Sequence, residues 1–147
     1  MRDDVYIRHI QNNSNHWWFK GRKYLISSIL QRNIKKKKIE ILDFGSGSGT
    51  NLNMLSQFGK VYAYEPHKPT QKYLKLKFKN KKFNIISSIG KKKFDLIVLA
   101  DVLEHLKNDK REIKNLSQKL KKNGKFLITV PAFQLLFTKK DKILGHY

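Results

Sequence analysis

The sequence predicts an α/β protein with a doubly wound, mostly parallel sheet and helices on both of its faces. Short apolar segments alternate with longer amphipathic ones, which is the order of strands and helices in such proteins. Residues 96–100 and 126–130 are almost entirely apolar, as expected for central strands that helices cover on both sides. Because ligands bind such sheets at the carboxyl ends of the strands, we expect the functional residues there.

The first predicted elements surround a glycine-rich turn. Apolar residues at helical spacing predict a helix over 22–32, which follows an aromatic cluster at 16–19. The short apolar run 40–44 predicts the first strand, and the turn after it leads into a helix over 51–58 with its apolar residues on one face. Strand, turn and helix therefore form the first unit of the fold.

The next elements repeat this alternation. Residues 61–64 predict the second strand. Residues 69–80 predict a helix, although alternate apolar residues in this segment also fit a strand. Short apolar runs predict further strands over 83–86, 94–100 and 125–130.

A helix is expected before the last of these strands. Ile113, Leu116 and Leu120 recur at helical spacing. Gly124 stands where a C-terminal cap would end this helix. The sequence therefore predicts that the helix includes Leu120.

Length and composition indicate a single domain over residues 1–147, with a helical and aromatic segment at 1–35, a core at 40–131 and the start of a further part at 132–147. The absence of cysteine excludes disulfides, thiolate zinc sites and cysteine nucleophiles. No apolar run approaches the roughly 20 residues of a membrane helix, and the N-terminus has no signal-peptide pattern. We therefore expect a soluble, cytoplasmic protein.

The formal net charge of +21 comes from 32 basic and 11 acidic residues, and it raises the question of a nucleic-acid or anionic-membrane partner. Few of the basic residues are arginine, the residue that phosphate-binding and base-reading surfaces prefer. The lysine runs also lie between apolar segments rather than along one stripe. A solvated lysine coat is the favoured interpretation, and a nucleic-acid partner stays an alternative.

The strongest local signal is an acidic residue followed by three alternating glycines, Asp43-Phe44-Gly45-Ser46-Gly47-Ser48-Gly49. Glycines let a backbone approach a ligand closely, and such a turn delivers main-chain N–H groups to it. Thr50 stands where a nicotinamide-dinucleotide fingerprint has its third glycine. No Gly-Lys-Ser/Thr follows as in a phosphate loop. These departures disfavour both of those nucleotide sites.

The motif Asp-x-Gly-x-Gly-x-Gly after a first strand resembles motif I of class I S-adenosylmethionine-dependent methyltransferases, whose fold is Rossmann-like. In that family the turn wraps the methionine moiety and the sugar of the cofactor. An acidic residue at the end of the second strand holds both ribose hydroxyls, which a carboxylate can do because it accepts two hydrogen bonds at once. Here that position is Glu65, 20 residues after Gly45. The resemblance implies cofactor contacts for Asp43, Gly45, Ser46, Gly47, Gly49 and Glu65.

Later segments extend the resemblance over most of residues 40–131. Residues 94–105, FDLIVLADVLEH, resemble motif IV, and residues 119–131, KLKKNGKFLITVP, resemble the region of the fifth strand. The segments HWWFKGR at 16–22 and LGHY at 144–147 resemble a bacterial, type 11/12-like subset often linked to polysaccharide or lipid-linked biosynthesis.

One departure concerns the adenine end of the cofactor. The family commonly places an Asp after the third strand, whereas this chain has Ser87-Ser88 there. We expect Ser88 or a backbone group to substitute for that Asp.

The cluster Asp101, Glu104 and His105 follows the fourth predicted strand. Asp101 is expected to contact the cofactor, and His105 is the candidate catalytic residue, as general base for an acceptor hydroxyl. The three residues are also candidates for a divalent metal site. The favoured interpretation has no metal, with the block capping the strand and shaping the pocket.

Residues near the N-terminus add two further candidates. Trp17, Trp18 and Phe19 fit either a lid over the site or an aromatic cluster that packs the first helix onto the sheet. Arg22 is a candidate for the carboxylate of the cofactor.

The function that the resemblance implies is methyl transfer from S-adenosylmethionine to a small-molecule or glycan- or lipid-linked acceptor. The alternatives are an RNA methyltransferase, for which the charge is the only argument, and a non-catalytic cofactor- or nucleic-acid-binding module. Methyl transfer needs mainly alignment and a dry site, so no protein nucleophile is expected.

The family fold normally continues after the fifth strand with a helix and an antiparallel strand pair. The chain has 16 residues after Pro131, so we expect this final pair to be missing and the last strand to have an unprotected edge. A truncated chain with weak stability or little activity of its own is the expectation.

Overall fold

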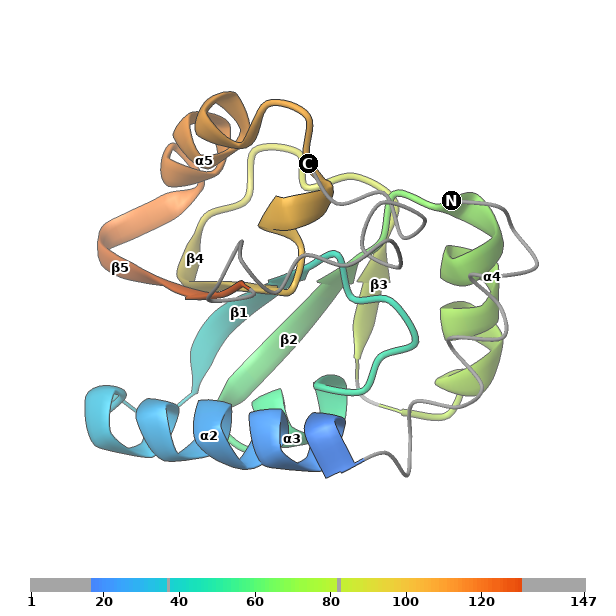
Figure 1. Ribbon diagram of the computed structural model, residues 1–147, viewed down its shortest axis with the longest axis horizontal. Helices are drawn as coiled ribbons and strands as arrows, with labels where there is room; N and C mark the ends of the chain where they lie inside the picture. The colour runs from blue at the N-terminus through green and yellow to red at the C-terminus, as the bar shows by residue number, and fades with distance from the viewer. Residues whose placement is uncertain (1–16, 37, 82, 131–147) are drawn as a thin grey trace, which may run out of the picture.

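The computed structural model describes residues 17–36, 38–81 and 83–130, in which helices and strands alternate as predicted (Figure 1). The elements in chain order are α2 (Trp17–Asn33), β1 (Ile39–Phe44), α3 (Leu52–Leu55), β2 (Gly59–Tyr64), α4 (Lys68–Lys77), β3 (Asn84–Ile86), β4 (Phe94–Ala100), the 3-10 helix η1 (Leu103–His105), α5 (Asp109–Ser117) and β5 (Leu120–Thr129).

The strands form one five-stranded sheet in the order β3-β2-β1-β4-β5, and every pairing in it is parallel. From β1 the chain moves through β2 to β3 at one edge, and from β4 to β5 at the other. The direction of winding therefore changes between β1 and β4. In doubly wound sheets this change creates a crevice at the carboxyl ends of the strands, where ligands bind.

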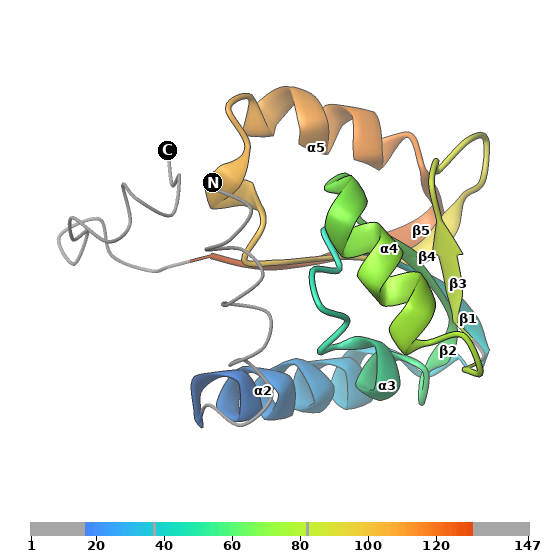
Figure 2. The ribbon, with the colours of Figure 1, turned by 90° about the vertical axis from the view of Figure 1, so that its right-hand side faces the viewer.

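Helices cover both faces of this sheet, which confirms the predicted fold class. Figure 2 shows α5 on one side of the sheet and α2 and α3 on the other. A hydrophobic core lies on each face of the sheet, and successive side chains of the central strands point alternately into one core and the other. In β4, Leu96 and Val98 pack with α2, α3 and α4, whereas Ile97 and Leu99 pack with α5. This two-sided burial explains why residues 96–100 of the strand are all apolar.

The helix predicted before the last strand is present as α5, but the predicted position of its end is wrong. Helix α5 ends at Ser117, and Leu120 is the first residue of β5, where it pairs with Phe94. Gly124 lies within β5 at a register irregularity and does not cap a helix. A Cβ at Gly124 would lie 2.9 Å from the carbonyl oxygen of Lys121, so the glycine permits a close backbone approach rather than a helix end.

Other boundaries differ less from the expectation. The helix over 68–77 is confirmed, with Leu74 fully buried, so the strand alternative for this segment is wrong. Helix α3 is one turn long and ends at Leu55 rather than at Phe58, which remains partly buried beside it. Within the described ranges no helix is long and apolar enough to cross a membrane. The expected features at 1–16 and 131–147 lie outside the described residues.

Candidate functional site

Positive φ angles shape the turn after β1. Gly45, Gly47 and Gly49 have φ values of +74°, +51° and +76°. A Cβ at Gly45 would lie 2.7 Å from the side chain of Val102, and one at Gly49 would lie 2.4 Å from the ring of Phe78. The space beside Gly47 is open. The outer two glycines therefore let the turn pack closely, and the middle one leaves the backbone accessible to a ligand.

Glu65 fastens this turn to the end of β2. Its Oε2 accepts a hydrogen bond from the amide of Gly47 at 2.8 Å, and its Oε1 accepts one from the amide of His67 at 2.9 Å. The side chain is 3% exposed. The two motif residues, 18 positions apart in the chain, are thus in direct contact at the carboxyl ends of neighbouring strands.

Ser46 stabilises the same turn from within. Its hydroxyl donates to the carbonyl of Asp43 at 2.8 Å, and its amide donates to the carbonyl of Tyr64 at 3.1 Å. The amide of Gly45 donates to the same carbonyl at 2.9 Å. The buried hydroxyl therefore acts inside the turn, and a contact between Ser46 and a cofactor stays a prediction.

Asp43, at the end of β1, is buried and only partly compensated. It is 2% exposed, and its Oδ2 has no hydrogen-bond partner among the described residues. Burial raises the pKa of Asp43 to about 7, and the charge of Glu65 also raises it, whereas Arg22 lowers it. A buried carboxylate without full compensation is costly, and a cation placed beside it would reduce that cost.

Arg22 on α2 reaches across to the carboxyl end of β4. Its Nη1 donates to Oδ2 of Asp101, 79 residues further along the chain. Burial lowers the pKa of Arg22, whereas the charges of Asp43 and Glu104 raise it. Burial also raises the pKa of Glu104, whose Oε2 has no hydrogen-bond partner in the described part of the chain. One guanidinium thus faces three carboxyl groups, and this excess of acid favours a positively charged ligand.

Two further predicted residues, Ser88 and His105, have exposed side chains. Ser88 is exposed after β3, and its hydroxyl accepts a hydrogen bond from the amide of Gly90 at 3.3 Å. His105 is exposed at the end of η1, where its amide donates to the carbonyl of Val102 at 3.0 Å. Their roles toward adenine and acceptor remain predictions.

The metal candidates do not converge on one ion. Over 17–36, 38–81 and 83–130, no group of three His, Asp or Glu side chains is arranged to hold a metal, and this applies to Asp101, Glu104 and His105. Of the predicted aromatic lid, Trp17 is 73% exposed at the start of α2. The side chains of Trp18 and Phe19 lie outside the described residues.

Thr129, at the end of β5, is a site residue that the sequence reasoning missed. Its hydroxyl donates to Oδ1 of Asp101 at 2.7 Å, and its carbonyl accepts a hydrogen bond from the amide of Asp101 at 3.0 Å. One signal for it existed, because Thr129 is the one polar residue in the otherwise apolar run 126–130.

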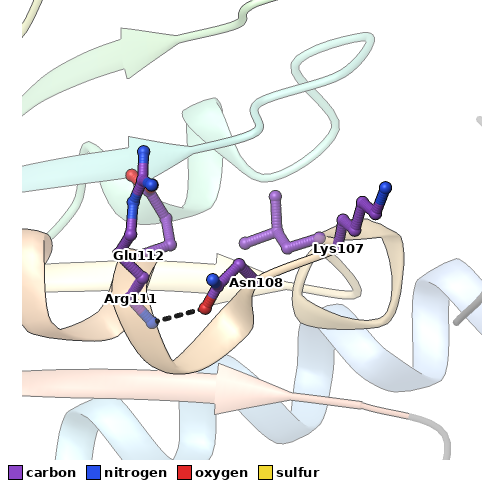
Figure 3. Close-up of a pocket in the computed structure, with 5 residues that line it drawn as sticks. Lys107, Asn108, Arg111 and Glu112 are labelled. Atoms are coloured by element: carbon purple, nitrogen blue, oxygen red, sulfur yellow. Dashed lines mark hydrogen bonds between the residues drawn. The ribbon is translucent and has the colours of Figure 1, made fainter.

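A hollow of about 370 Å³ lies beside the start of α5 (Figure 3). The side chain of Asn108 caps this helix there, accepting a hydrogen bond from the amide of Arg111 at 3.2 Å. The hollow is lined by Leu106, Lys107, Asn108, Arg111 and Glu112, none of which belongs to the glycine turn or the acidic cluster. We therefore place the candidate site at the carboxyl ends of β1, β2 and β4, where the motif residues meet.

Solved structures with the same fold include several methyltransferases. DesVI of Streptomyces venezuelae is 14% identical, with a TM-score of 0.69 over 94% of this chain and 61% of that protein. The PH0226 protein of Pyrococcus horikoshii is 17% identical, with a TM-score of 0.68 over 87% and 65%. The plantazolicin methyltransferase BpumL, solved with a pentazolic desmethylPZN analog and SAH, is 20% identical, with a TM-score of 0.64 over 80% and 49%. These likenesses confirm the predicted Rossmann-like α/β fold.

The chain spans about half the length of several such structures, 49% and 50% in two cases. No curated protein shows significant sequence similarity to it. A family described as a methyltransferase domain matches residues 18–142, which includes the glycine turn, Glu65 and the acidic cluster. The chain therefore belongs to this family of methyltransferase domains.

Proposed function

We propose that this chain binds S-adenosylmethionine at the carboxyl ends of β1, β2 and β4 and transfers its methyl group to a small-molecule or glycan- or lipid-linked acceptor. The observation that carries the proposal is the contact between the Gly47 amide and the Glu65 carboxylate. This contact joins the open part of the glycine turn to a carboxylate that can accept hydrogen bonds from hydroxyl groups.

Glu65 fits the ribose of this cofactor. Each of its oxygens accepts one backbone amide, from Gly47 or from His67, and each carboxylate oxygen has a second lone pair. Those lone pairs suit two neighbouring hydroxyl groups. The amide bonds also fix the carboxylate before a ligand arrives, which lowers the entropic cost of binding.

The acidic cluster fits the other end of the cofactor. S-adenosylmethionine carries a positive sulfonium and an ammonium group beside one carboxylate. The buried Oδ2 of Asp43 and Oε2 of Glu104 have no hydrogen-bond partner in the described residues, and a cationic ligand would compensate both. The guanidinium of Arg22 lies among these acids and is suited to the cofactor carboxylate.

The chemistry requires little of the protein beyond alignment. When bound, the cofactor supplies an activated methyl group for in-line displacement. His105 is the candidate base for an acceptor that must lose a proton. The small-molecule part of the proposal is supported by the name of one structural relative, the plantazolicin methyltransferase solved with a pentazolic analog.

Calorimetric titration of the chain with S-adenosylhomocysteine tests the cofactor. Glu65→Gln should weaken binding by roughly 10- to 150-fold, since an amide nitrogen replaces one of the two accepting oxygens and a hydrogen bond to a charged group contributes about 1.5–3 kcal/mol. Glu40→Gln is the matched control, because it removes the same charge at the opposite end of the sheet. It should leave affinity unchanged, and NADH should not bind.

A folded chain that fails to bind S-adenosylhomocysteine would overturn the proposal. Equal affinity in the wild type and Glu65→Gln would also overturn the assignment of the ribose site. A thermal melt of each variant establishes that it is folded before titration.

A further inference from the structure

Asp101 is held in a single conformation by the end of β5. Its φ of +55° is rare for a residue with a side chain and requires support from its surroundings. Thr129 supplies that support, because its carbonyl accepts from the Asp101 amide at 3.0 Å and its hydroxyl accepts from the same amide at 3.2 Å. The hydroxyl also donates to Oδ1 of Asp101 at 2.7 Å. Ala100 and Thr129 are also partners in the β4–β5 register. The carboxylate of Asp101 therefore has a fixed direction.

The second oxygen of this carboxylate faces α2. Oδ2 of Asp101 accepts from Nη1 of Arg22, so the two oxygens bind one group each, from β5 and from α2. The side chain of Arg22 is 10% exposed, and its charge is near Asp43 at the glycine turn. The Arg22 side chain, which comes from α2, is thus held at the carboxyl ends of the strands by Asp101. The direction of the Asp101 carboxylate in turn depends on Thr129.

We infer that Thr129 is a positioning residue for cofactor binding: through Asp101 it holds the Arg22 guanidinium where the carboxylate of the cofactor's amino-acid end would lie. The inference rests on the proposed function. It deepens that proposal by assigning a role in cofactor binding to a residue outside the glycine turn and Glu65. A guanidinium pairs best with a carboxylate when its planar fork is held in one orientation, which is what the Thr129–Asp101 contact provides.

The test compares two ligands that differ only at the amino-acid end. S-adenosylhomocysteine carries the carboxylate and an ammonium group, whereas 5′-methylthioadenosine has the same nucleoside and sulfur without either. The Arg22→Lys background below shows whether an effect acts through the guanidinium. Thr129→Val removes the hydroxyl and keeps both shape and backbone carbonyl. It should weaken S-adenosylhomocysteine binding by about tenfold, the usual effect of one hydrogen bond to a charged group, and leave methylthioadenosine binding unchanged.

Two further variants separate positioning from general packing. Thr129→Ser retains the hydroxyl and should restore the affinity for S-adenosylhomocysteine. In an Arg22→Lys background, Thr129→Val should cause no additional loss, because both changes act through the same guanidinium.

Loss of both ligands to the same degree in Thr129→Val would overturn the inference, as would unchanged binding of S-adenosylhomocysteine. A failure of the proposed function gives a different result, since the wild-type chain would then bind neither ligand.

Discussion

Acidic side chains have different surroundings at the two ends of the sheet. At the amino ends of β1 and β4, Glu40 and Asp95 are surrounded by lysines. Lys121 lies 2.9 Å from a carboxylate oxygen of each, and Lys92 lies 2.7 Å from Glu40. The amide of Glu40 also donates to Asp95 at 2.9 Å. Every one of these contacts favours the charged form of the acids.

The pKa values at this end follow from the contacts. Hydrogen bonds from Lys92 and Lys121 lower the pKa of Glu40 to about 2. Burial would raise the pKa of Asp95, but the Glu40 amide and the nearby lysines outweigh it and lower the pKa to about 2. Part of the high lysine content therefore compensates acids of the same chain. The net excess of basic residues is not accounted for by these pairs, and a nucleic-acid partner for it stays an untested alternative.

At the carboxyl ends, Glu65 is held by backbone amides, whereas Asp43 and Glu104 are desolvated by burial and share the charge of Arg22. The pKa values of Asp43 and Glu104 are raised by burial, and each carboxyl has an oxygen with no hydrogen-bond partner among the described residues. At the amino ends, lysines of the same chain compensate the negative charges. At the carboxyl ends, the buried carboxyl groups are only partly compensated, so a positively charged ligand would be favoured there. This contrast favours the carboxyl ends as the candidate functional end, and it does so independently of any motif.

The largest expected effect comes from a glycine at each end. A Cβ at Gly59, at the start of β2, would lie 1.9 Å from the carbonyl oxygen of Ile39. Gly59→Ala should therefore lower the free energy of unfolding by about 3 kcal/mol or more, since backbone atoms must move. Gly47→Ala should cost only about 1 kcal/mol for its positive φ, because the space beside it is open.

Ligand binding should rank these two variants the other way. Gly47→Ala should weaken S-adenosylhomocysteine binding by tenfold or more, because the added methyl group enters the open side of the turn. A tenfold loss corresponds to about 1.4 kcal/mol of binding free energy. Folded Gly59→Ala should bind normally. Urea unfolding and calorimetry measure the two quantities, and the opposite ranking would remove the distinction between the two ends.

An effect of similar size is the pH dependence that Asp43 imposes. Its pKa is about 7 in the folded chain and near 3.8 when unfolded, so the folded state binds more protons between these values. The contribution of Asp43 to stability therefore falls as pH rises from about 4 to about 7, and is constant above that. At about 1.4 kcal/mol per unit, the full change is on the order of 4 kcal/mol.

Asp43→Asn should remove this dependence. The stability of the wild type relative to Asp43→Asn should decline between about pH 4 and about pH 7 in urea titrations, while Glu104 continues to act in both proteins. Glu65 and Arg22 face Asp43 with opposite charges and are unchanged in the variant. A difference between the two proteins that is constant with pH would mean that Asp43 is charged throughout.

The sequence predicts the sheet and the glycine turn but not the contrast between the two ends. Apolar runs and the glycine spacing locate the sheet and the turn, because they depend on local periodicity and on backbone freedom. The contact between Glu65 and Gly47 could be anticipated, since both follow parallel strands. The Thr129–Asp101–Arg22 chain could not, because it joins side chains from β5, β4 and α2 whose relative placement depends on packing.

The error at Leu120 has a related cause. Its spacing from Ile113 and Leu116 fits a helix, and the same residue fits the start of a strand. The pairing of Leu120 with Phe94 decides between them, and that contact is set by the neighbouring strand rather than by the local pattern.

The smallest expected effect concerns the lysines at the amino end. Lys121 contacts both Glu40 and Asp95, but its side chain is 36% exposed, so solvent screens the interaction. Lys121→Gln should lower the free energy of unfolding by less than about 1 kcal/mol, and the loss should shrink in high salt.

The difference between wild type and Lys121→Gln should also depend on pH, with the sign opposite to that of Asp43. The lowered pKa values of Glu40 and Asp95 stabilise the fold above about pH 4, and this contribution is lost as pH falls toward about 2. Urea unfolding of both proteins across this range measures it. A large effect of Lys121→Gln that does not depend on salt would mean that solvent screens the charges at the amino end no better than those at the carboxyl end. Solvent exposure would then not explain the difference between the two ends.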